Sequence, residues 1–253
     1  MKLTNLAVAV LGVCIFAGGV RADTFIVAPN GATATEATSN NGFPFNIGDF
    51  GTAAMRYQQV YGASQFSALG GPGLITQILF RPDVSTGGAF SATLPDLQIN
   101  MSTTAATVDG LSSTFASNVG GNNTIVYARG SLSLSSAFTG PVGGPKDFDI
   151  VINLTTPFLY DPGAGNLLME VFNFGGGFTT QFDAAVEADG VSRVFSTNNS
   201  ATATTGGTDT SGLVTEFRFG STNPVPEPST LLLLGTAAGS VLAVTRRRLA
   251  GRQ

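Results

Sequence analysis

Between residues 23 and 222 the apolar residues recur at every second position, and this period constrains the fold more than any other feature of the chain. Phe148, Ile150, Ile152 and Leu154, for example, would all lie on one face of a strand. Such alternation is typical of half-buried antiparallel strands. It predicts about ten strands, near residues 24–28, 57–66, 74–81, 97–103, 124–134, 148–155, 167–174, 178–186, 191–196 and 213–219.

Glycine-rich breakers separate these segments, among them 70–73, 140–145 and 175–177. No segment of residues 23–222, which we call the body, has convincing helical amphipathicity. No fixed-period repeat indicates a solenoid or propeller. The chain's 19 Phe residues suit a core between two sheets, because Phe supplies a large apolar area without a polar atom. We therefore expect an all-β fold: an antiparallel β-sandwich, jelly-roll-like, of about ten strands.

The composition excludes several function classes. Residues 23–225 contain six Lys/Arg against 15 Asp/Glu, and an acidic body without a basic patch is unsuited to nucleic acid. The chain has no His, so Ser-His-Asp and Cys-His catalysis and histidine-ligated metal sites are excluded. The single cysteine, Cys14, lies in the N-terminal apolar segment and leaves residues 23–222 without a thiol.

The N-terminus has the features of a secretory signal peptide, residues 1–22. Lys2 supplies the positive start, Leu6 to Phe16 form an apolar segment, and Ala22 is a small residue at the expected cleavage position. We predict cleavage between Ala22 and Asp23. A lipoprotein signal at Cys14 is the alternative, although Val13 is the wrong residue before the cysteine.

The C-terminus divides into three parts: a Pro-rich segment at 223–229, a single transmembrane helix at 230–245 and a basic cytoplasmic tail at 246–253. The Pro-rich segment is expected to be extended, because proline fixes φ and restricts the residue before it. The charge-free run from Thr230 to Val244 would span ~23 Å as a helix, which is short for a bilayer. Arg246, Arg247 and Arg248 orient the helix with the body outside the cytoplasm.

The succession of Val225-Pro226-Glu227-Pro228, an apolar helix and a basic end resembles the PEP-CTERM sorting signal. The resemblance covers about the last 30 residues. It implies recognition by the membrane-embedded processing enzyme exosortase, with Pro226, Glu227 and Pro228 as substrate residues that catalyse nothing. It also implies a bacterium that makes exopolysaccharide, and delivery of the protein to the cell surface or extracellular matrix.

Within the body, chemistry could come only from carboxylates and other oxygen ligands. Asp147 and Asp149 lie two residues apart, about 7 Å along a strand, and could form a two-carboxylate pair for glycoside hydrolysis. Solvated charges at a strand edge explain them more simply. No cofactor is expected; calcium is the ion that oxygen ligands favour, with Asp147, Asp149, Asp161 and Asn166 as its weak candidates.

The sequence thus predicts a secreted, non-enzymatic surface or matrix protein, sorted by exosortase after export by the Sec machinery. Before processing it would be anchored transiently in the membrane by its C-terminal helix. The alternative is a carbohydrate- or calcium-binding sandwich module of the exopolysaccharide layer, and a two-carboxylate polysaccharide-active enzyme is a third reading.

Overall fold

The apolar alternation is realised as antiparallel strands in the computed structural model, which describes residues 24–220 except 187–188 and 197. The helical segments of this range are four short 3-10 helices: η1 (Asn30–Ala32), η2 (Ile47–Phe50), η3 (Ala63–Leu69) and η4 (Phe115–Asn118). The strands are β1 (Thr24–Ala28), β2 (Ser39–Asn41), β3 (Met55–Tyr61), β4 (Gly73–Phe80), β5 (Phe90–Thr104), β6 (Thr124–Ser136), β7 (Ile150–Tyr160), β8 (Asn166–Asn173), β9 (Phe182–Ala185), β10 (Val191–Phe195), β11 (Gly207–Asp209), β12 (Gly212–Leu213) and β13 (Thr215–Gly220). The predicted all-β class is confirmed.

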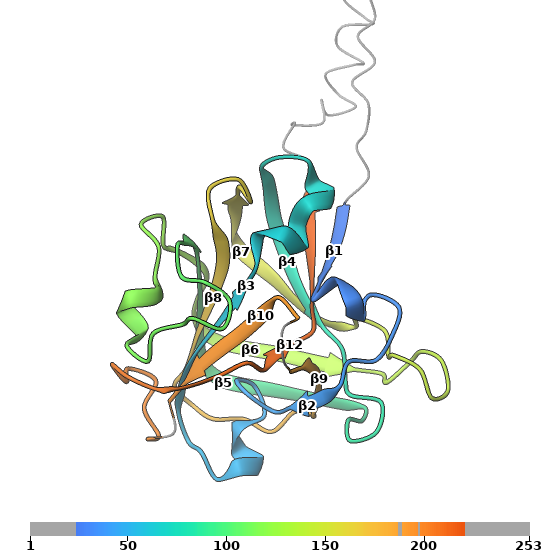
Figure 1. Ribbon diagram of the computed structural model, residues 1–253. Helices are drawn as coiled ribbons and strands as arrows, with labels where there is room; N and C mark the ends of the chain where they lie inside the picture. Colours follow the sequence, from blue (N-terminus) through green and yellow to red (C-terminus); the bar gives the residue numbers. More distant parts are fainter. Residues whose placement is uncertain (1–23, 187–188, 197, 221–253) are drawn as a thin grey trace, which may run out of the picture. The chain divides into compact units, whose positions relative to one another are not determined.

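The strands form a four-stranded sheet in the order β1-β13-β4-β7 and a six-stranded sheet in the order β11-β10-β3-β8-β5-β6 (Figure 1). A small third sheet has the order β12-β9-β2. The pairs β1–β13, β3–β8, β4–β7 and β5–β6 are all antiparallel. The first and last described strands, β1 and β13, therefore pair with each other, while β5 and β6 in the middle pair as neighbours.

One hydrophobic cluster takes side chains from both large sheets. Phe217 of β13 lies 4.9 Å, between ring centroids, from Tyr61 of β3 and 5.4 Å from Phe66 of η3, and all three rings are buried. Glu216 and Arg218 alternate with the buried positions of β13 and are partly exposed. The period-two pattern thus places one face of each large sheet in a shared core.

Several strand boundaries differ from the sequence-based prediction. The strand predicted at 57–66 ends at Tyr61, and η3 follows it. Phe66 belongs to this helix and is buried, so in the sequence it resembles a further buried residue of the strand. Strand β5 begins at Phe90 instead of residue 97. The segment predicted at 213–219 is two strands, because Val214 between them donates its N–H to the carbonyl of Asp183.

The described part of the body begins and ends at neighbouring positions of one sheet. Thr24 at the start of β1 is paired with Phe219 near the end of β13, and Gly220 is paired with Leu74 of β4. The described residues form one compact unit. Among the described residues, no helix has the length and apolarity needed to cross a membrane.

Candidate functional site

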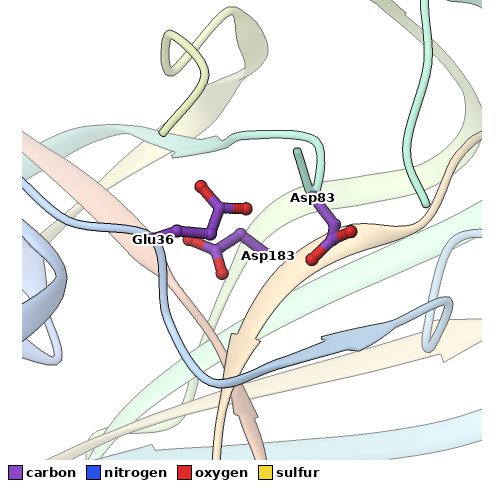
Figure 2. Close-up of side chains that lie close together, drawn as sticks. All are labelled: Glu36, Asp83 and Asp183. Carbon is purple, nitrogen blue, oxygen red and sulfur yellow. The ribbon is translucent and has the colours of Figure 1, made fainter. Parts of the chain in front are cut away.

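Three carboxylates from distant parts of the chain meet near the C-terminal end of β4. Glu36 lies in the loop between η1 and β2, Asp83 follows β4, and Asp183 belongs to β9. One oxygen from each lies within 4.8 Å of the others. Figure 2 shows Asp183 between the other two side chains. None of the three was predicted as a site residue.

Arg81 supplies the positive charge of this cluster. Its Nη2 lies 2.6 Å from Oδ2 of Asp183, and its Nε donates to the same oxygen at 2.7 Å. Nη2 also donates to the carbonyls of Ala32 (2.9 Å) and Thr35 (2.7 Å), and the guanidinium lies over the ring of Phe148. The side chains are 2% and 0% exposed, so this is a fully buried ion pair.

The local sequence explains how these groups are held. Asp83 Oδ1 accepts hydrogen bonds from the N–H and hydroxyl groups of both Ser85 and Thr86, and so caps the turn that follows β4. Asp183 is held through its main chain, since its N–H donates to the carbonyl of Arg81. Its side chain accepts the N–H of Ala37 at 3.1 Å, which fastens the η1–β2 loop to β9.

The cluster is too acidic for one guanidinium to neutralise. Burial raises the pKa of Asp183 to about 6, and the nearby Glu36 carboxylate adds to this effect against the opposing influence of Arg81. Burial likewise raises the pKa of Glu36. Burial acts in the same direction on Asp83, but the hydrogen bonds from Thr86 and Ser85 outweigh it and lower the pKa of that carboxyl.

The raised pKa values of Asp183 and Glu36 predict that the body becomes less stable as the pH rises from about 4 to 6. A group whose pKa is higher in the folded state binds more protons there, so it stabilises the fold in acid and loses that contribution as pH passes its folded pKa. For Asp183 this window runs from 3.8 to about 6. Asp183→Asn should flatten the profile of unfolding free energy against pH in urea titrations.

Asp96→Asn is the control for this measurement. The hydrogen bonds from Arg129 lower the pKa of Asp96, so its contribution is lost only at more acidic pH. The slope between pH 4 and 6 should therefore survive this substitution. An equally steep slope in Asp183→Asn would contradict the assignment.

The chemistry of the cluster is that of a structural ion network. Carboxylate oxygens are the ligands that calcium prefers, but two nitrogens of Arg81 already bind Asp183. The main-chain N–H of Val84 donates a hydrogen bond to Oε1 of Glu36 at 2.7 Å. The arrangement joins the η1–β2 loop, the turn after β4 and strand β9, and the geometry indicates a role in holding these three segments together.

The structure separates the four weak calcium candidates. Asp149 directly precedes β7 and Asp161 directly follows it, so roughly 30 Å of strand lies between them. Asp149 accepts the N–H of Ala137, and Asp147 lies in the same loop. Both polar atoms of the Asn166 side chain have protein partners, because Oδ1 accepts the N–H of Ala63 and Nδ2 donates to the carbonyl of Ala106. A single ion therefore cannot bind all four.

The residues predicted for export and sorting lie outside the described range. They are Ala22 and Asp23 at the predicted signal peptidase site, the sorting residues Pro226, Glu227 and Pro228, and the orienting residues Arg246, Arg247 and Arg248. The transmembrane helix predicted at 230–245 also lies outside it. Comparison with known proteins bears on the C-terminal part of these segments.

The segment that follows the all-β body matches a known sorting signal of exported proteins. Residues 224–248 match the model of the PEP-CTERM protein-sorting motif. This confirms the resemblance drawn from Pro226, Glu227 and Pro228. The motif implies a secreted, cell-surface protein that exosortase processes. No curated protein and no solved structure matches the chain.

Proposed function

We propose that this chain is a non-enzymatic bacterial surface or extracellular-matrix protein whose body is delivered to the exopolysaccharide layer by its C-terminal signal. The observation that carries the proposal is the PEP-CTERM match at residues 224–248. In this proposal the Sec machinery exports the chain, and signal peptidase cuts between Ala22 and Asp23. Exosortase then reads the tail.

The tail serves in this proposal as a temporary anchor. Residues 230–245 would cross the membrane with Arg246, Arg247 and Arg248 in the cytoplasm, in accord with the preference of Lys and Arg for that side. The apolar run is short, and flanking arginines and local bilayer thinning compensate a short helix at modest cost. The Pro-rich segment at 223–229 would then be accessible outside the membrane.

The proposed cargo is a jelly-roll β-sandwich. Eight strands form four antiparallel pairs that are nested along the chain: β1 with β13, β3 with β8, β4 with β7, and β5 with β6. In chain order, the first of the eight thus pairs with the last, the second with the seventh, the third with the sixth and the fourth with the fifth. Two sheets made in this way from a chain folded back on itself are the jelly-roll arrangement. The core that both sheets share supports face-to-face packing.

A structural or interaction role is favoured over catalysis by the chemistry of the body. The chain has no His, and its one Cys lies outside the body. The main-chain and side-chain hydrogen bonds of Asp147 and Asp149 fasten the loop before β7. If the body were a polysaccharide-active enzyme, it would have a hydrolytic activity that Asp147→Asn or Asp149→Asn abolishes. If it were a carbohydrate-binding module, it would bind glycans on an array, measured with and without calcium.

The sorting proposal predicts that replacing Pro226, Glu227 and Pro228 with alanines blocks removal of the tail. Exosortase would no longer find the extended peptide that it reads, so the full-length anchored form should accumulate. Mass spectrometry of the C-terminal peptide, in cells that contain exosortase, measures this directly.

Three alanines at Ser221, Thr222 and Asn223 provide a control with the same number of changes just before the motif. This variant should be processed like the wild type. Equal processing of the motif variant, or a wild-type tail that is never removed, would show that the proposed sorting route is wrong.

A further inference from the structure

The motif begins very close to the last strand of the body. Strand β13 ends at Gly220, and the matched motif starts at residue 224, so only residues 221–223 separate them. Even fully extended, this spacer covers about 10–14 Å. A folded unit of about 200 residues has a radius of gyration of about 16 Å, so the body is wider than the spacer is long.

The end of β13 cannot fray to lengthen this spacer without breaking core contacts. Phe219 is 4% exposed, and its ring lies 6.2 Å from that of Phe66. Gly73 makes room for the same ring, because a Cβ at this position would lie 2.6 Å from Cδ1 of Phe219. The chain is therefore fixed in the sheet up to the point at which it leaves the body.

A hollow of about 470 Å³ lies at the same end of the body. We call its exposed rim the terminal surface. Leu159 belongs to this rim, is 58% exposed, and pairs with Leu74, which in turn pairs with Gly220. Two strand spacings therefore separate Leu159 from the departure point of the tail, about 10 Å. The terminal surface comprises Pro72, Thr103, Gly121, Asn122, Leu159, Asp161 and Ala164.

Pro226, the first of the three sorting residues, lies at most about 22 Å from Gly220, so a protein that binds the motif is held next to this end of the body. Figure 1 shows the ends of β1 and β4 at the top of the view, with β2 at the far end. We propose that the terminal surface docks on the extracytoplasmic face of the membrane-embedded processing enzyme while the motif is bound. The inference rests on the proposed function, since it requires that exosortase processes this tail.

The test compares arginine substitutions at the two ends of the body in the full chain. Ala164→Arg and Leu159→Arg place a bulky charge on the terminal surface, whereas Val142→Arg places it at a fully exposed position in the loop between β6 and β7. Pulse-chase measurement in cells that contain exosortase should show tail removal at least tenfold slower for Ala164→Arg and Leu159→Arg. Val142→Arg should be processed at the wild-type rate.

A ten-residue Gly/Ser insertion after Gly220 completes the test. It adds up to ~35 Å of reach, so the body no longer has to meet the enzyme and both slow variants should return to within twofold of the wild-type rate. Wild-type rates for both arginine variants without the insertion would overturn the docking. So would slow processing that the insertion fails to relieve, because the slow step would then not depend on contact between the body and the enzyme. If the wild-type tail is never removed, the proposed function fails instead.

Discussion

Replacing Asp183 by alanine should lower the free energy of unfolding of the body by about 3–5 kcal/mol. The substitution leaves the guanidinium of Arg81 buried without its partner, and an uncompensated buried charge costs far more than the pair contributes when intact. It also removes the acceptor for Ala37 N–H, so the η1–β2 loop loses its attachment to β9. Urea unfolding of the purified body, followed by circular dichroism, measures the loss.

Two further variants show whether the buried charge is the cause. Asp96→Ala breaks an ion pair with Arg129 in which the two side chains are 35% and 54% exposed, and it should change stability far less than Asp183→Ala. The double variant Arg81→Met with Asp183→Leu removes both charges and should recover much of the stability, because an apolar pair has no desolvation penalty. A double variant no more stable than Asp183→Ala would show that shape and hydrogen bonding dominate.

Phe217→Ala should destabilise the body by about 3–5 kcal/mol, the usual range for deleting a buried aromatic ring. Phe217 is fully buried at the centre of β13, where its ring packs against Tyr61 from the other large sheet and Phe66 from η3. The deletion leaves a cavity between two sheets whose backbones are fixed by their own ladders, so little collapse can relieve it. The midpoint of urea unfolding should fall accordingly.

Phe178→Ala is the matched control, because it deletes the same ring from a side chain that is 68% exposed. Its cost should stay below about 1 kcal/mol. Similar losses for the two variants would mean that the core does not lie between the two large sheets.

Apolar residues located most of the strands, although β5 begins seven residues before its predicted start and β7 ends five residues after its predicted end. Strands β4, β6 and β8 begin and end within about two residues of the prediction. The short strands β2 and β11 were missed, since three residues cannot display a period of two and β11 is exposed throughout. Strand β9 was predicted too long, because periodicity does not reveal where a backbone finds its hydrogen-bond partner.

The carboxylate cluster could not be predicted, because its members are separated by many residues and only the fold brings them together. One signal was present: Arg81 directly follows the apolar end of β4 in a chain with few charges, and a charge in that place requires a buried partner. The sequence offered no means of choosing Asp183 as that partner. The sorting signal, in contrast, is read from consecutive residues and was predicted without a fold.

The pairing of β1 with β13 also determines when folding can finish. The first strand of the body has no ladder partner until the last strand is available, because Thr24 pairs with Phe219. When the chain is exported N-terminus first, β1 therefore remains unpaired until nearly the whole body has been exported. Such distant pairings slow folding. The sheet is completed only when the residues just before the tail have arrived, so a truncated body would expose an unfinished edge.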